Sequence, residues 1–169
     1  MNPPTENSSR RPLHFESIAA LAAEIDWLVA AQHAGHLEAR GNWTPAQIFD
    51  HLALFIEFSY EGFPFRASWP LRAFSHVAKW IAWKPFVDWA LRPGFRIPAG
   101  AEALKPDPWA DFDVAAARLH AALVRIAGGE PMRVPSPFEG AITHDQWVYV
   151  HLRHAELHLS FLDLRSPRD

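Results

Sequence analysis

The sequence has 169 residues and contains no cysteine. This absence excludes a disulfide-linked scaffold, a thiolate metal site and a cysteine nucleophile. There is also no run of about 18 uncharged apolar residues, so we expect no membrane-spanning helix. Basic side chains are too few to drive nucleic-acid binding, because 16 Lys and Arg stand against 19 Asp and Glu and give a net charge of −3. A hydrophobic content of 49% over this length predicts one domain with a sizeable core.

The N-terminal segment, MNPPTENSSRRP, is polar and rich in proline. It lacks the apolar stretch of a secretory signal, so we expect a soluble, cytoplasmic protein. We predict that residues 1–12 form a disordered tail and that residues 13–169 form a single helical domain.

The rest of the chain shows the periodicity of helices rather than that of strands. Apolar residues recur at steps of three and four over four long segments, which we predict to be amphipathic helices: residues 15–34, 45–60, 111–127 and 144–164. The second and the last of these begin with a capping box, at Thr44–Gln47 and at Thr143–Gln146. The expected fold class is therefore all-α, a four-helix bundle with a short helical insertion between its second and third helices.

The insertion, Trp69–Phe95, interleaves aromatic residues with lysine and arginine. Pro85 predicts two short helices joined at that proline, and residues 92–111 predict a long ordered loop. We rank first a cover over the open end of the bundle, at the mouth of a pocket, or the interface of a homodimer. Association with a membrane surface ranks second. Stacking on single-stranded nucleic acid ranks last, because the overall charge is acidic.

Histidine is abundant, with 10 residues in the chain. On the last predicted helix His151, His154 and His158 fall within an arc of about 60°. His154 and His158 are four residues apart, the spacing that lets two imidazoles reach one metal ion from one helix face. His51, on the apolar face of the second predicted helix, is the candidate third ligand. Three imidazoles with open positions suit Zn²⁺, Ni²⁺, Fe²⁺ or Mn²⁺, and nitrogen ligands alone do not choose among these ions. The alternative is that these histidines are hydrogen-bonded core residues without a metal.

Several residues near the predicted ligands are candidates for supporting roles. His151 is expected to hydrogen-bond a ligand or to shuttle protons near neutral pH. The aromatic residues on the same side are expected to line the pocket: Phe55, Trp147 and Phe161. We interpret Trp43 as fixing the start of the second helix rather than contacting a substrate. No catalytic residue is assigned, because the nearby carboxylates are interpreted as solvated surface charges: Asp50, Glu57, Glu61 and Glu156.

Two segments carry a family resemblance. GNWTPAQIFDHLA, residues 41–53, and HAELHLSFL, residues 154–162, resemble the DinB-like superfamily and, more narrowly, its uncharacterised DUF1569 branch. The segment SPFEGAIT, residues 136–143, loosely matches the loop that precedes the last helix in that branch. The resemblance follows chain order over most of the sequence.

The resemblance implies a four-helix bundle with up-down-down-up topology. It also implies a divalent ion held by one histidine of the second helix and two of the last, which correspond by position to His51, His154 and His158. The sequence departs from the branch at Leu157, where a second histidine often precedes the His-Leu pair, and by an inserted Glu139. Neither departure removes an implied ligand.

The superfamily includes thiol S-transferases and enzymes similar to maleylpyruvate isomerase. The resemblance therefore implies a metal-dependent enzyme that acts on a small molecule, as a thiol transferase or a hydrolase. A low-molecular-weight thiol cofactor would supply the sulfur that the chain lacks. The alternative function is a non-catalytic binding or interaction bundle.

Overall fold

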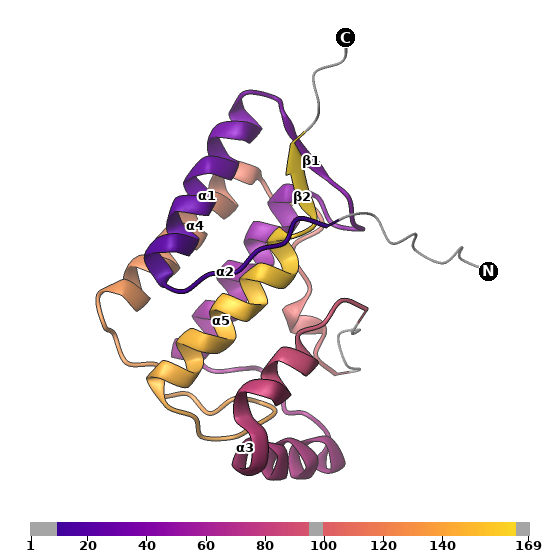
Figure 1. The fold of residues 1–169 in the computed structure, drawn as a ribbon, viewed down its shortest axis with the longest axis vertical. Coiled ribbons are helices and arrows are strands. Elements are labelled where there is room, and N and C mark those ends of the chain that lie inside the picture. The colour runs from indigo at the N-terminus through magenta and orange to yellow at the C-terminus, as the bar shows by residue number, and fades with distance from the viewer. Residues whose placement is uncertain (1–9, 95–99, 165–169) are drawn as a thin grey trace, which may run out of the picture.

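The fold, a computed structural model that describes residues 10–94 and 100–164, is mostly helical, as predicted (Figure 1). The described residues form these elements in chain order: α1 (Ile18–His33), β1 (Leu37–Ala39), α2 (Pro45–Glu61), α3 (Trp69–Ala90), the 3₁₀ helix η1 (Glu102–Leu104), α4 (Phe112–Ala127), α5 (His144–Leu159) and β2 (Leu162–Leu164). Residues 1–9 of the expected tail and Phe95 at the end of the expected insertion lie outside the described residues. None of the helices in the described ranges combines the length and the apolar character that crossing a bilayer requires.

The core lies among α1, α2, α4 and α5. Helix α2 packs against α4 and α5, and α1 also contacts both α4 and α5 (Figure 1). Each of the four helices contributes apolar side chains that are almost wholly buried, among them Leu21, Ile25, Phe49, Leu119, Trp147 and Leu159. Burial of these faces is the main stabilising contribution, and it fixes α2 and α5 next to each other.

Both predicted capping boxes are present. At the start of α5 the backbone N–H of Gln146 donates to Thr143 Oγ1 over 3.2 Å, and the N–H of Thr143 donates to the Gln146 side chain over 2.9 Å. The Thr44–Gln47 pair at the start of α2 has the same arrangement. These bonds satisfy backbone donors that have no partner within the helix, and so they fix where α2 and α5 begin.

Removal of the α5 cap should have a measurable cost. We expect Thr143→Ala to lower the free energy of unfolding by about 1 kcal/mol, because the hydroxyl acceptor is lost. Thr143→Ser keeps that acceptor, so its free energy of unfolding should be close to that of the parent protein. Urea unfolding of the three proteins tests this, and equal stability of the alanine variant and the parent would contradict it.

The last helix is shorter than predicted, and a small sheet follows it. Helix α5 ends at Leu159 rather than near residue 164, and β2 pairs with β1 in antiparallel register, Leu37 opposite Leu164 and Ala39 opposite Leu162. Leu162 is completely buried. The all-α prediction did not include this two-stranded sheet. Strands of three residues are too short to show alternation, and it is the partner strand that makes the extended conformation favourable.

The short described part of the expected tail is bonded to this sheet region. The Arg11 backbone N–H donates to Ser160 O over 3.2 Å, and its guanidinium donates to Leu162 O over 2.6 Å. The same guanidinium forms an ion pair with Glu24 of α1. Arg11 thus joins the start of the described chain to both α1 and the segment that follows α5.

Helix α3 breaks at a different residue from the one predicted. The backbone leaves the helical conformation at Ala82, with φ −156° and ψ 66°, and not at Pro85. The proline ring would clash with the carbonyl of Ile81, four residues earlier, if the helix were continuous. The break at Ala82 removes this clash and places Pro85 in the first turn of the second half, where a missing N–H costs nothing.

Helix α3 packs on the outer face of α5. Asp88 accepts a hydrogen bond of 2.7 Å from the Tyr149 hydroxyl, and the Lys84 ammonium lies 5.3 Å from the Tyr149 ring centroid. At 100° per residue Tyr149 lies about 140° and 180° around α5 from His154 and His158. The segment therefore packs opposite the histidine face, which does not support the expectation that it lines the mouth of a histidine pocket.

Candidate metal centre

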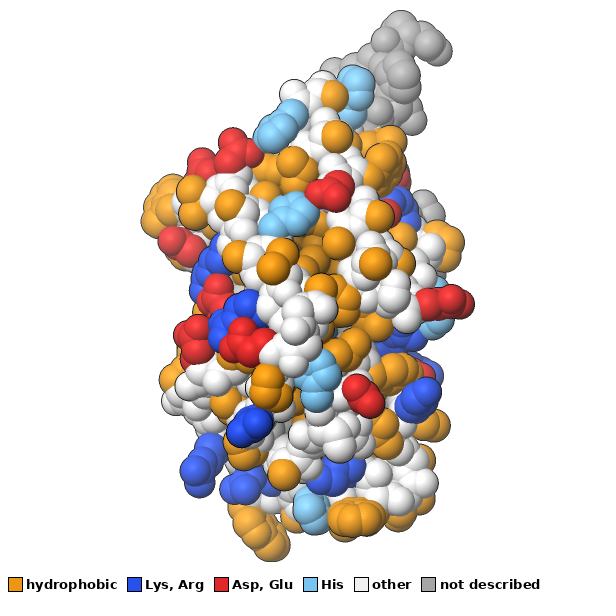
Figure 2. Space-filling view, turned by 90° about the vertical axis from the view of Figure 1, so that its left-hand side faces the viewer, with side chains coloured by type: hydrophobic (Ala, Val, Ile, Leu, Met, Phe, Trp, Pro, Cys, Tyr) orange, Lys and Arg blue, Asp and Glu red, His pale blue; other side chains and the backbone are white. Residues whose placement is uncertain are grey.

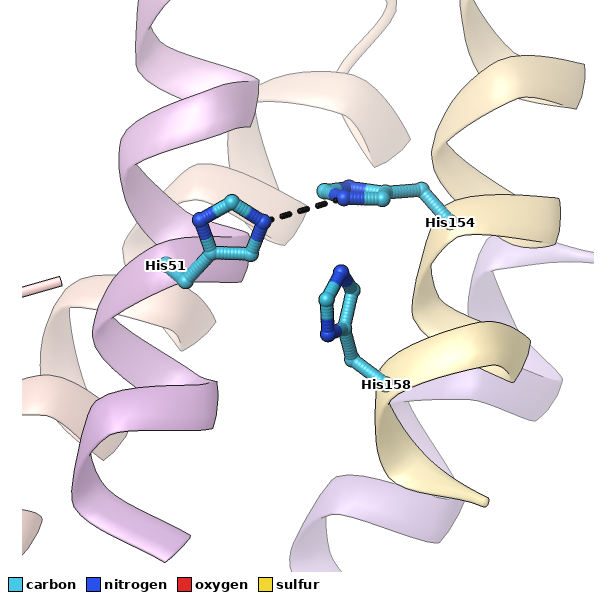
Figure 3. Close-up of side chains that lie close together, drawn as sticks. All are labelled: His51, His154 and His158. Atoms are coloured by element: carbon cyan, nitrogen blue, oxygen red, sulfur yellow. Dashed lines mark hydrogen bonds between the residues drawn. The ribbon is translucent and has the colours of Figure 1, made fainter. Parts of the chain in front are cut away.

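Three histidines from two helices converge between α2 and α5. His51 projects from α2, and His154 and His158 project from successive turns of α5 toward it (Figure 3). His51 Nε2 lies 3.1 Å from His154 Nε2, and one ring nitrogen from each of the three residues lies within 4.8 Å of the others. The structure thus brings together the three residues that the spacing singled out.

The apolar faces of the two helices carry these rings into the interior. His51 stands between Ile48 and Phe55 on the buried side of α2 and is 3% exposed, and His154 is 7% exposed. His158, near the end of α5, is half-buried. The cluster is therefore removed from bulk water on most sides, and its electrostatic interactions are stronger than they would be at the surface.

A backbone carbonyl fixes the proton on His51. His51 Nδ1 lies 2.5 Å from the carbonyl oxygen of Leu104, at the end of η1. A carbonyl only accepts, so Nδ1 must carry the hydrogen and donate it. The lone pair is then on Nε2, which faces His154 and His158. This carbonyl contact is the usual outer partner of a metal-binding histidine, because it fixes both the tautomer and the ring orientation.

Burial keeps the cluster neutral. It lowers the pKa of His51 to about 4, although the Leu104 carbonyl and Asp50 act in the opposite direction. The pKa values of His154 and His158 are also lowered well below the usual range, first by burial and then by the positive charge that a neighbouring imidazole would carry. At neutral pH the three rings are uncharged and can offer lone pairs, which is the state that a cation requires.

The donor geometry fits a transition-metal ion. With metal–nitrogen bonds of about 2.1 Å, two nitrogens on one ion are about 3.0 Å apart at a right angle and about 4.2 Å apart on opposite sides. The observed separations, 3.1 Å for the His51–His154 pair and at most 4.8 Å in the cluster, require only small inward shifts. Three imidazole nitrogens could therefore hold one metal ion, and this donor set alone does not identify the metal.

Trp43, interpreted from the sequence as fixing the start of α2, also packs against the histidine rings. Its ring stacks on His158 with centroids 5.3 Å apart and an interplanar angle of 13°, and it lies 4.8 Å from the His51 ring centroid. Trp43 directly precedes Thr44, the N-cap residue of α2. In the fold it covers two of the three histidines.

The expected supporting residues take different roles. His151 points to Ser59, with 3.2 Å between Nε2 and the hydroxyl, and burial lowers its pKa to about 3. It therefore stays neutral near pH 7 and does not fit the proton-shuttle role. Trp147 stacks on His151, with centroids 5.4 Å apart, and belongs to the core. Phe55 contacts His154 at 4.5 Å between centroids, as pocket lining should, whereas Phe161 follows α5 and packs against Gly41.

The nearby carboxylates are paired with arginines rather than simply solvated. Asp50 and Glu57 both bind Arg118, and Glu61 binds Arg125. Glu156 lies 2.6 Å from the Arg153 guanidinium and also accepts the backbone N–H of Phe15. The side chains of Asp50 and Glu156 are only 13% and 14% exposed. The interpretation as solvated surface charges is therefore wrong for these two, which serve to join elements of the fold.

Comparison with known proteins gives a family. No curated protein and no solved structure matches the chain. A family model described as "Protein of unknown function (DUF1569)" matches residues 7–165, a range that includes all three histidines of the cluster. The chain therefore belongs to the DUF1569 family.

Proposed function

We propose that the protein binds one divalent transition-metal ion through His51, His154 and His158, within a four-helix bundle of the DinB-like type. The observation that carries this proposal is the convergence of three neutral ring nitrogens in a buried space, with the tautomer of His51 set by the Leu104 carbonyl. The packing of α1, α2, α4 and α5 around one core supports the bundle part of the proposal.

The proposed activity is metal-dependent chemistry on a small molecule, of the thiol-transfer or hydrolytic type. A bound divalent ion with open positions supplies a Lewis acid that lowers the pKa of a bound thiol or water. The chain contributes orientation and exclusion of water: Leu104 holds His51 in position, and Trp43 and Phe55 pack on the histidine rings. Because the chain has no cysteine, any reacting sulfur would come from a low-molecular-weight thiol.

One observation favours a second candidate, a metal-binding bundle without catalysis. The carboxylates closest in sequence to the ligands, Asp50, Glu57 and Glu156, are already engaged by arginines. These side chains join elements of the fold, so none of them is assigned as a general base. Turnover assays with the metal-loaded protein, using thiol and ester substrates, would separate the two candidates.

Elemental analysis tests the metal proposal. Protein purified without a polyhistidine tag is expected to contain close to one equivalent of a divalent transition metal, or to take up one equivalent of Zn²⁺ or Ni²⁺ after treatment with a chelator. Metal at about 100 times its dissociation constant should add about 2.7 kcal/mol to the free energy of unfolding. Absence of metal together with an unchanged melting temperature in Zn²⁺ and Ni²⁺ would refute it.

A further inference from the structure

Helix α3 exposes large apolar side chains to solvent. Trp69, Trp80 and Ile81 are 78%, 78% and 79% exposed, and three further apolar residues of this helix are more than half exposed: Phe74, Val77 and Trp89. Exposures this high mean that these side chains protrude from the surface instead of lining a groove. Contiguous apolar surface of this kind marks an interaction site in most proteins.

The exposed residues form one face in the first half of α3. At 100° per residue, the exposed apolar residues between Trp69 and Ile81 lie within an arc of about 140°. The opposite side of the helix faces the protein, and Ser75 at its centre is 1% exposed. Lys79, also on the inner side, donates to Ala141 O over 2.7 Å and so fixes the helix in this orientation. The apolar face is therefore turned outward by specific contacts.

The same region is basic in an acidic protein. Residues 62–94 contain five Lys and Arg and one Asp, a net charge of +4, whereas the whole chain carries −3. The single acid, Asp88, is hydrogen-bonded to Tyr149. Arg66, Arg72 and Arg92 are exposed. On the face that Figure 2 shows, several blue side chains lie at the lower end of the molecule, where α3 lies, orange ones lie there as over the rest of the face, and the acidic side chains lie higher.

We propose that the outer face of α3 docks on an anionic lipid surface. Tryptophan and aliphatic side chains on one side of a helix, with arginine and lysine beside them, are the composition of helices that lie in the bilayer interface. Negative headgroups complement the local charge of +4. A second copy of the chain would bring like charges together across a two-fold axis. Single-stranded nucleic acid is bound in grooves, and the α3 face protrudes.

Vesicle co-sedimentation of the full-length protein tests the proposal. The protein should pellet with vesicles of phosphatidylserine and phosphatidylcholine, pellet much less with pure phosphatidylcholine, and be released as salt is raised. The double variant Trp80→Ser, Ile81→Ser should lose binding. The matched control is Trp109→Ser, which removes a tryptophan that is 88% exposed but lies outside α3, and it should bind like the parent.

A charge variant gives a second test that leaves the apolar face intact. Arg66→Gln with Arg72→Gln removes two exposed charges and should weaken partitioning about 25-fold. Circular dichroism checks that each variant remains folded. The proposal is overturned if the parent does not pellet with anionic vesicles, or if the α3 variants bind as well as the parent. Two other outcomes would also overturn it. One is that the parent forms a dimer without binding vesicles, with the dimer lost in the α3 variants. The other is that the parent binds single-stranded DNA without binding vesicles, with that binding lost in the α3 variants.

This inference is independent of the metal proposal. The face of α3 does not include the histidine cluster, and chelator treatment should leave vesicle binding unchanged. Failure of one proposal therefore leaves the other standing.

Discussion

Replacement of His154 by alanine is expected to abolish stoichiometric metal binding. The three ring centroids form a triangle, with His154 4.9 Å from His51 and 4.6 Å from His158, and loss of His154 leaves two nitrogens on different helices. Loss of an outer hydrogen-bond partner of a metal ligand already costs about 10- to 100-fold in affinity, and loss of a ligand should cost more than about 100-fold. Isothermal titration with Zn²⁺ and elemental analysis measure the effect.

The control for this experiment is an exposed histidine. His36 lies on the surface between α1 and β1, and His36→Ala should bind metal like the parent. Because His154 is buried, circular dichroism must show that its variant is folded, and His158→Ala, at a half-buried position, provides a second ligand deletion. Retention of one equivalent of tightly bound metal in both ligand variants would show that the ion lies elsewhere.

The metal-free protein is expected to lose stability steeply between pH 7 and pH 5. Burial holds the pKa of His51 at about 4 and that of His151 at about 3, against 6.5 in an unfolded chain. Below pH 6.5 the unfolded state therefore binds protons that the folded state does not, so acid favours unfolding. The contribution of these neutral, buried imidazoles to the free energy of unfolding is fully present above pH about 6.5. It is lost as the pH falls toward the pKa values of the folded state. Over this window each of the two residues should contribute about 2 kcal/mol, and His154 and His158 act in the same direction.

Urea unfolding at a series of pH values measures this dependence. Most carboxyl groups titrate below pH about 5, so the chosen window reports mainly on histidine. His151→Gln keeps a donor for Ser59, removes one titrating group and should lower the mean slope between pH 7 and pH 5 by about 1 kcal/mol per pH unit. A free energy of unfolding that is constant from pH 7 to pH 5 would mean that these imidazoles are not buried in the neutral form. Metal should oppose the loss of stability until protons displace it.

The parts of the fold that were predicted correctly are those that depend on neighbours within one helix. The capping boxes at Thr44 and Thr143 involve residues only three positions apart, and the four-residue step from His154 to His158 places both rings on one face. Such short-range patterns are visible in one sequence. His51 could be paired with them because it stood on an apolar helix face.

The parts that were missed depend on contacts between distant segments. The apolar residues after Leu159 continue the helical spacing, but they form the strand β2 because they pair with β1. His151 lies in the same predicted arc as the ligands, but its ring contacts the Ser59 hydroxyl and is not part of the cluster. Trp43 reaches His158 across more than a hundred residues of chain. No local pattern encodes these contacts, so tertiary packing decides them.

The contact between His51 and η1 has a consequence for mutagenesis. The acceptor is the backbone oxygen of Leu104, which every amino acid carries, so replacement of the Leu104 side chain would leave the hydrogen bond in place. An alanine scan of residues 102–104 would therefore not detect the Leu104 carbonyl oxygen, on which the orientation of the His51 ring depends. Insertion or deletion of a residue in η1 would displace that oxygen, and so would expose a dependence that side-chain replacement conceals.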